Sequence, residues 1–143
     1  MLYNYTNKMK NKTSILNKLL PIFIVFIIAN CIATLGRAWL LQYKINADVV
    51  IGANLLLFLV SLAVLVMHSK AITNKNPNAV VRSMMLGTLI KLIVVATAVL
   101  TYVMVSGVNK NAYGVFCGMG LYIIYAFIEV RISSKMKKEN GNN

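Results

Sequence analysis

The sequence predicts an all-α membrane protein whose four transmembrane helices form two antiparallel hairpins. Apolar residues make up 59% of the chain and charged residues 13%, whereas about a quarter of the residues in an ordinary soluble domain are charged. The apolar residues also gather in four blocks, each close to the ~20 residues that a helix needs to cross the hydrocarbon core of a bilayer. The predicted spans are residues 19–41, 49–67, 80–105 and 112–130.

The segments outside these spans are short. We expect a basic arm at residues 1–18, a four-helix transmembrane domain at residues 19–130 and a basic tail at residues 131–143. Residues 1–14 show no sustained helical stripe of apolar residues, so we expect them to lie flexible at the membrane surface. The arm, the tail and the connections leave no room for a soluble catalytic domain in this chain.

The formal net charge of +12 comes from 15 basic and 3 acidic residues, a balance that by itself is compatible with nucleic-acid binding. Position argues against that function, because Lys and Arg concentrate before the first span, around the second loop and after the fourth span. Cytoplasmic flanks are enriched in these residues. The pattern predicts a multi-pass membrane protein with both termini cytoplasmic and membrane lipids as partners. The flanking residues are Lys8, Lys10, Lys12, Lys18, Lys70, Lys75, Arg82, Arg131, Lys135, Lys137 and Lys138.

The first hairpin is predicted to begin near Pro21, where a missing backbone donor costs little, and to turn at residues 42–48. Folding the hairpin about this turn places Asn54 at about the depth of Arg37, so the two side chains are candidates for a polar pair within the membrane. In an equally good interpretation, Arg37 reaches outward to lipid headgroups, since basic and aromatic residues collect at that interface.

The middle connection, residues 69–78, is rich in Asn and contains Pro77, a composition typical of turns. His68 precedes it and has no acidic residue or second histidine nearby in sequence, so we expect an interfacial surface residue and not a ligand. Cys31 and Cys117 lie inside predicted spans without a CxxC or Cys/His partner. We interpret both cysteines as apolar packing residues and expect no metal or cofactor.

Lys91 is the most informative residue of the third span. It stands 11 residues after Val80 and so near mid-membrane, where a lysine costs about 2.5–3.5 kcal/mol on an insertion scale. Ser83, Gly87 and Lys91 lie along one helical face, and the two small residues let a neighbouring helix approach where the lysine emerges. We therefore take Lys91 as the centre of a candidate site, with Gly87 and Arg82 as further contacts.

The fourth span carries Gly114 and Gly118, a small-xxx-small spacing that favours close helix packing. Tyr122, Tyr125 and Glu129 continue nearly the same stripe, so the packing face ends in a carboxylate. The glycine motif is most often internal packing, and alone it says little about oligomerisation.

Lys91 and Glu129 are predicted to pair. Folding the last hairpin about residues 108 and 109 places Glu129 about one turn to the cytoplasmic side of Lys91, within reach of a lysine ammonium. The hydroxyls of Tyr122 and Tyr125 are candidates for additional partners. Three other roles of Lys91 stay open: it snorkels toward the cytoplasm, it contacts a partner protein, or it lies on a transport pathway.

The sequence lacks the residues that several classes of protein need for their function. It contains no Ser/His/Asp or Cys/His arrangement and no Gly-rich phosphate loop, so we predict that the protein is not an enzyme. Small four-helix multidrug exporters depend on a glutamate in the first span, where this chain offers Asn30. No repeat relates the two hairpins, which disfavours a transporter built from internal repeats, while a dimer of the whole chain can supply symmetry.

The second and third spans resemble ATP synthase protein I, a family of small four-helix bacterial membrane proteins. The likeness runs from Gly52 to Met67-His68, across the short basic, Pro-containing loop, to Arg82 and the segment Gly87-Thr88-Leu89-Ile90-Lys91. It covers about 45 residues, whereas the fourth span is similar only in position and hydropathy. Family members often carry an acid directly after the glycine, and this chain has Thr88 there.

The resemblance implies a nonenzymatic membrane assembly factor that helps the proton-conducting rotor ring of the F-type ATP synthase to assemble. It also implies an alternative, because magnesium uptake has been suggested for the family, and a small-ion or solute transporter is the second interpretation. Glu129 is the residue that can replace the missing acid and neutralise Lys91. The close-packing residues Gly87, Gly114 and Gly118 suit contact with ring subunits, which are themselves helical hairpins rich in small residues.

Overall fold

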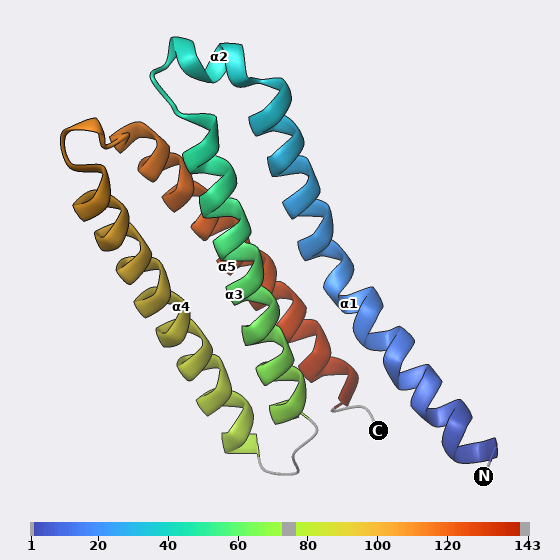
Figure 1. The fold of residues 1–143 in the computed structure, drawn as a ribbon. Coiled ribbons are helices and arrows are strands. Elements are labelled where there is room, and N and C mark those ends of the chain that lie inside the picture. Colours follow the sequence, from blue (N-terminus) through green and yellow to red (C-terminus); the bar gives the residue numbers. More distant parts are fainter. Residues whose placement is uncertain (1, 73–76, 141–143) are drawn as a thin grey trace.

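The computed structural model describes residues 2–72 and 77–140, where its regular elements are α-helices and one 3-10 turn. The long helices run side by side as an elongated bundle, with both ends of the chain at the same end of it (Figure 1). The prediction of an all-helical protein is confirmed. The elements are α1 (Leu2–Leu35), α2 (Arg37–Gln42), α3 (Ala47–Ile72), α4 (Pro77–Ser106), η1 (Gly107–Asn109) and α5 (Ala112–Asn140).

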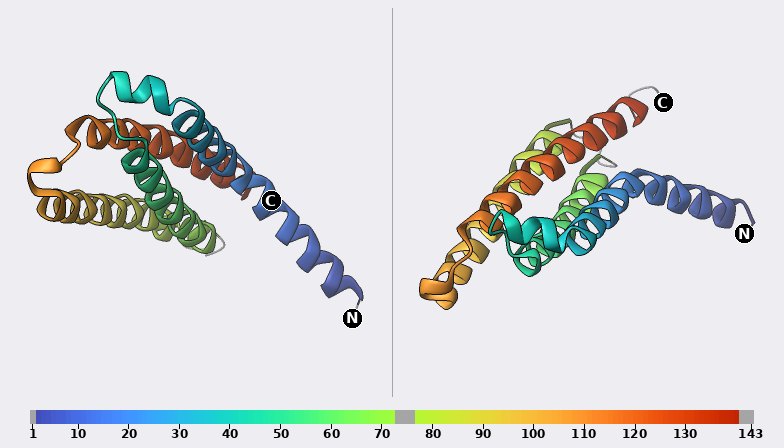
Figure 2. Two further views of the ribbon diagram at one scale, coloured as in Figure 1. Left: turned by 45° about the horizontal axis from the view of Figure 1, so that its top comes forward. Right: turned by 90° about the horizontal axis from the view of Figure 1, so that it is seen from above.

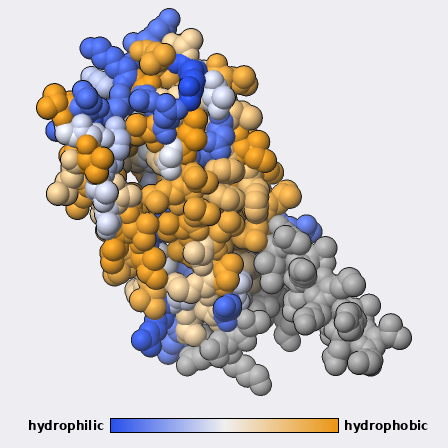
Figure 3. Space-filling view, viewed as in Figure 1, coloured by the Kyte–Doolittle hydropathy of each residue, from blue (hydrophilic) through white to orange (hydrophobic). Residues whose placement is uncertain are grey.

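Three helices in the described part of the chain are long and apolar enough to cross a membrane. They are Ala47–Ala71, Asn78–Asn109 and Ala112–Met136, and they correspond to the second, third and fourth predicted spans. Apolar side chains form a belt across the middle of the molecule, and hydrophilic side chains gather toward its two ends (Figure 3). These are the features of a membrane protein, as the sequence predicts.

The first predicted span differs from the expectation, because it is not one continuous helix. Its apolar part, Leu19–Leu35, is shorter than the apolar stretches of the other three long helices and ends at Leu35, and the separate short helix α2 begins at Arg37. Gly36 lies between them with a φ of −86° and a ψ of 13°, outside ordinary helical geometry. A Cβ at this glycine would lie 2.6 Å from the carbonyl oxygen of Ile32, so the break requires a residue without a side chain.

The N-terminal arm also differs from the expectation of a flexible segment, since α1 is helical from Leu2 onward and contains Pro21 in its interior. An internal proline removes one backbone hydrogen bond and bends a helix, and α1 changes direction along its length (Figure 2). At the other end of the chain, the helix does not stop where the predicted span ends, at residue 130. Helix α5 continues to Asn140, and Ile132 and Met136 are buried within the bundle.

Helix α3 is the centre of the bundle, and it packs against α1, α4 and α5. Within the apolar stretches of these helices, 39% of the residues are buried in α3, 17% in α5 and 6% in α4. Helices α4 and α5 both pack mainly on α3 and little on each other, and the prediction of two paired hairpins misses this central role of α3. The core between α1, α3 and α5 contains Ile22, Leu57, Phe58, Leu65, Tyr125, Ile132 and Met136.

Candidate functional site

A buried ion pair joins α4 to α5 in the interior of the bundle. The Lys91 ammonium lies 2.8 Å from Glu129 Oε1, and the two residues are 1% and 7% exposed. The same ammonium donates a hydrogen bond of 3.0 Å to Ser61 Oγ on α3. The structure thus contains the predicted pair, and it adds a third helix whose hydroxyl the sequence-based hypothesis did not include.

Two tyrosine rings complete the surroundings of the ammonium. Lys91 Nζ lies 5.4 Å from the ring centroid of Tyr122 and 5.7 Å from that of Tyr125, within the range in which an aromatic face attracts a cation. The expectation that the tyrosine hydroxyls are partners of the pair is wrong for Tyr125, whose hydroxyl donates to Asn54 Oδ1 over 2.8 Å. The ring of Tyr125 lies beside the Lys91 ammonium, while its hydroxyl belongs to a second layer of polar contacts, which surrounds Asn54.

Asn54 forms that second layer, between α1, α3 and α5. Its amide nitrogen donates a hydrogen bond of 3.1 Å to the carbonyl oxygen of Phe26 on α1, and its oxygen accepts from Tyr125. The hypothesis that Asn54 pairs with Arg37 is therefore wrong. Arg37 is exposed and forms an ion pair with Asp48 at the end of the bundle that carries α2, in line with the alternative in which it reaches outward.

His68 forms a third layer, and its expected position at the surface is wrong. The residue is 6% exposed, its Nδ1 lies 3.0 Å from Ser133 Oγ on α5, and its Nε2 lies 3.1 Å from the carbonyl oxygen of Ser83 on α4. Gly87 makes this contact possible, because a Cβ there would lie 2.8 Å from His68 Nε2. The hydroxyl oxygen of Ser83 is buried and lacks a hydrogen-bond partner among the described residues.

The three layers share a simple pattern on α3. Asn54, Ser61 and His68 recur every seven residues and are 1%, 0% and 6% exposed. A seven-residue spacing keeps side chains on nearly the same face of a helix over several turns. Sequence reasoning missed Ser61 and misplaced His68, although this polar repeat inside an apolar helix was visible and marks the buried side of α3.

The predicted packing glycines of α5 lie against α3. A Cβ at Gly114 would lie 3.1 Å from Val49 Cγ1, and one at Gly118 would lie 3.1 Å from Ala53 Cβ. The small-xxx-small motif therefore serves packing within the chain. Arg82, in contrast, is exposed on α4, and the structure does not bring it to the cluster around Lys91.

Comparisons with protein-family models, curated proteins and solved structures found no match. The resemblance to ATP synthase protein I thus stays a prediction. Within the described residues, no group of three or more His, Cys, Asp and Glu side chains is placed to hold a metal ion. What the geometry provides is a charge-neutral cluster that ties α3, α4 and α5 together at one depth.

Such a cluster suits a membrane interior. A lone lysine at mid-membrane costs about 2.5–3.5 kcal/mol, and a buried ion pair is tolerated when each charge is paired and hydrogen-bonded further. Lys91 meets both conditions through Glu129 and Ser61. The lysine is therefore directed inward, toward α3 and α5, and the opposite side of α4 carries no charge from it.

Proposed function

We propose that this protein is a nonenzymatic membrane assembly factor, which holds helical subunits of a larger complex before that complex closes. The proposed client is the rotor ring of the F-type ATP synthase, and the proposed location is a bacterial inner membrane. The observation that carries the proposal is the exposure of α4, since only 6% of the residues in its apolar stretch are buried within the chain. A full-length apolar helix is thus available for a neighbour in the bilayer.

The outer face of α4 is suited to lateral packing against another helix. Met85, Leu89, Leu92 and Ile93 are exposed there. The helix also carries exposed threonines, but their hydroxyls donate to carbonyls of α4 itself, from Thr88 to Met84, from Thr97 to Ile93 and from Thr101 to Thr97, over 2.8–3.0 Å. No polar requirement of these side chains therefore opposes a helix that packs on this face.

The cluster around Lys91 supports the same proposal. The family that this chain resembles often has an acid directly after the glycine, and Thr88 occupies that position here. Glu129 supplies a carboxylate to Lys91 from another helix, so the charge balance of the segment is kept by a different route. In this proposal Lys91 orients α4, and the outer face of α4 contacts the client.

We further propose four crossings of the membrane, with both termini in the cytoplasm. The first crossing would use the shorter apolar helix Leu19–Leu35, whose length at 1.5 Å per residue falls a little short of a ~30 Å hydrocarbon core. Two variants test this topology, Lys44→Cys and Lys135→Cys, each made in a chain whose native Cys31 and Cys117 have been replaced. Labelling of intact spheroplasts by a membrane-impermeant maleimide should reach position 44 and spare position 135; the reverse result would overturn the orientation.

The client is tested by deleting the gene and measuring the assembled rotor ring on native gels. We expect less assembled ring at an unchanged amount of free ring subunit, and an unchanged ring would overturn the proposal. A variant with Leu89→Trp and Ile93→Trp alters the outer face of α4 and should fail to restore the ring. Ile123→Trp, on the exposed side of α5, is the matched control and should restore it.

A small-ion or solute transporter is the second candidate, because ionisable residues inside a membrane often mark a transport pathway, and Lys91 and Glu129 are such residues. Magnesium suits the site less well, since a hard cation takes several oxygen ligands and the cluster offers one carboxylate beside an ammonium. Protein-dependent uptake into proteoliposomes that Lys91→Ala abolishes would favour this candidate over the assembly factor.

A further inference from the structure

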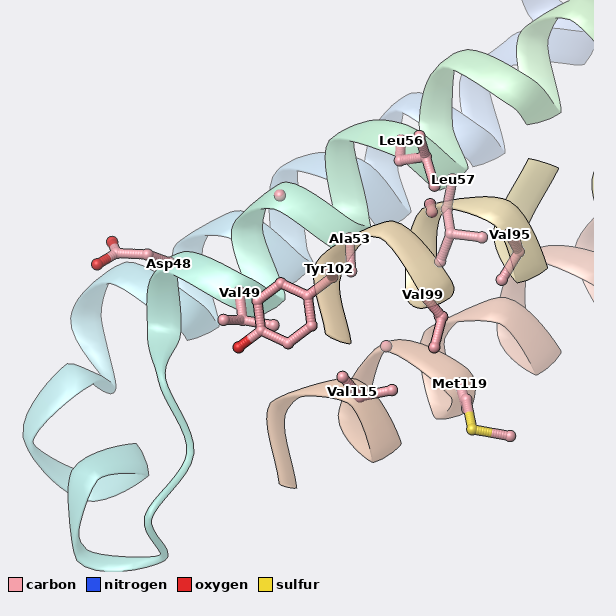
Figure 4. A pocket seen from close by; sticks show the side chains of 13 residues that line it. Asp48, Val49, Ala53, Leu56, Leu57, Val95, Val99, Tyr102, Val115 and Met119 are labelled. Atoms are coloured by element: carbon pink, nitrogen blue, oxygen red, sulfur yellow. The ribbon is translucent and has the colours of Figure 1, made fainter. Parts of the chain in front are cut away.

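An apolar groove opens between α3, α4 and α5 toward the end of the bundle that carries α2. Its volume is about 430 Å³, and side chains from all three helices line it (Figure 4). Asp48 and Tyr102 lie toward one end of the groove, whereas its other lining residues are apolar or glycine. The apolar lining includes Val49, Ala53, Leu57, Val95, Val99 and Met119.

A second, polar hollow of about 440 Å³ adjoins the groove at Asp48, which lines both. Arg37 and Lys44 contribute two positive charges to this hollow, against the single carboxylate of Asp48. Arg37 already forms an ion pair with Asp48, so the charge of Lys44 remains in excess. The hollow therefore favours an anion.

Hydrogen bonds of Asn111 connect the turn before α3 to the turn before α5, and so they fix the positions of the residues around both hollows. Its side-chain nitrogen donates to the carbonyl oxygen of Lys44 over 2.6 Å, and its side-chain oxygen accepts from the backbone N–H groups of Asn46 and Gly114 over 3.2 and 2.6 Å. Its own backbone N–H donates to the hydroxyl of Tyr102 over 3.0 Å. These bonds hold the turn that contains Lys44 beside the mouth of the groove.

The aromatic residues at this end mark the level of the membrane interface. Trp39 and Tyr43 are both exposed, and their ring centroids lie 4.9 Å apart. Tryptophan and tyrosine collect where lipid headgroups meet the hydrocarbon core. The polar hollow beside α2 thus lies at headgroup depth, and the apolar groove lies at the depth of acyl chains.

We infer that this end of the bundle binds one anionic glycerophospholipid, with an acyl chain in the apolar groove and the phosphate beside Arg37 and Lys44. A lipid is the occupant whose chemistry matches both parts at once, since a free anion leaves the groove unfilled and an apolar solute leaves the charge of Lys44 unanswered. The site is independent of the proposed client and requires only that the protein lies in a bilayer. Basic pockets between transmembrane helices on the cytoplasmic side bind anionic headgroups by the same attraction of charges.

Gly52 allows a sharp test of the acyl-chain part. It lines the groove, and a Cβ at this position would meet no atom within 4 Å, so Gly52→Phe can introduce a bulky side chain into the groove without a clash at its Cβ. Gly120 is equally open but does not line the groove, and Gly120→Phe is the matched control. Native mass spectrometry of the full chain in detergent, with added phosphatidylglycerol, should show one retained lipid in the wild type and the control and none in Gly52→Phe.

Lys44→Asn tests the headgroup part. Lys44 has a positive φ of 57°, a conformation that asparagine tolerates well, so the turn should persist without the charge. We expect phosphatidylglycerol to bind more tightly than phosphatidylcholine in the wild type, and Lys44→Asn to weaken phosphatidylglycerol binding about fivefold, the effect of one basic residue near an anionic surface. Equal retention in Gly52→Phe and Gly120→Phe would overturn the groove as a site, and equal binding of the two lipids would overturn its anionic selectivity.

Discussion

Lys91 and Glu129 are 38 positions apart in the sequence and 2.8 Å apart in the structure, and bulk solvent reaches almost none of either side chain. Each charge is acceptable in the apolar bundle because the other is present, since an ion that loses its partner in a buried site is strongly destabilising. The ion pair therefore connects α4 to α5, and each of its two residues needs the other to be stable in the bundle.

Lys91→Met or Glu129→Met alone should lower the free energy of unfolding by about 3 kcal/mol, because each leaves one buried charge unpaired. The double variant should regain more than half of that loss, since no charge remains in the bundle. Unfolding by sodium dodecyl sulfate from mild detergent micelles, followed by circular dichroism, measures both effects.

Lys135→Met is the control for this cycle, because Lys135 is exposed on α5 and its loss should change stability little. Losses in the two single variants that simply add in the double variant would contradict a direct interaction between Lys91 and Glu129.

Tyr125→Phe should destabilise the bundle by about 0.6 kcal/mol, the average for a hydrogen bond between membrane helices, and by no more than about 1.7 kcal/mol. The change keeps the ring beside Lys91 and removes only the hydroxyl that donates to Asn54. Tyr113 is an exposed tyrosine on the same helix, so Tyr113→Phe should have no comparable effect in the same unfolding assay. Equal stabilities of the two variants would exclude a contribution from the bond to Asn54.

Gly87→Ala should destabilise the protein by about 1–3 kcal/mol through overpacking. The added Cβ would lie 2.7 Å from Val64 Cγ1 and 2.8 Å from His68 Nε2, so α4 must move away from α3. Gly120→Ala adds the same methyl group where no atom lies within 4 Å, and it should be neutral or stabilise the helix by up to about 1 kcal/mol. Thermal unfolding that ranks the two variants in the opposite order would refute the close contact at Gly87.

His68 should resist modification by diethyl pyrocarbonate in the folded protein. It is the only histidine of the chain and is 6% exposed, with Ser133 Oγ within 3.0 Å of one ring nitrogen and the Ser83 carbonyl oxygen within 3.1 Å of the other. The absorbance of carbethoxylated histidine should therefore rise only after unfolding. Fast modification of the folded protein would place His68 at the surface, as the sequence alone had suggested.

The depth of a residue in this protein is easier to predict than the direction of its side chain. Counting along a hairpin brought Glu129 within reach of Lys91, because rise per residue is nearly constant in a helix. The same count aligned Asn54 with Arg37, yet Asn54 points to Tyr125 and Phe26. Rotation about the helix axis depends on which neighbours a helix has, and the central place of α3 emerges only from packing.

The errors at the ends of the first span have local causes. Residues 1–14 lack the apolar stripe of a buried helix, but a helix can form without one, as α1 does from Leu2. The break at Gly36 was also hidden, because hydropathy continues across it while the backbone geometry does not. Hydropathy reports the environment of a segment, and it says little about where one helix stops and the next begins.

The spacing of the ion pair also sets an order of events during synthesis. Glu129 follows Lys91 by 38 residues, so at a typical 5–20 residues per second it leaves the ribosome roughly 2–8 s later. For that interval Lys91 lacks its carboxylate partner, and a helix α4 that enters the hydrocarbon core alone bears the cost of an unpaired lysine, about 2.5–3.5 kcal/mol. The last two helices of this protein should therefore enter the bilayer together, as one hairpin, with the arrival of Glu129 as the step that commits them.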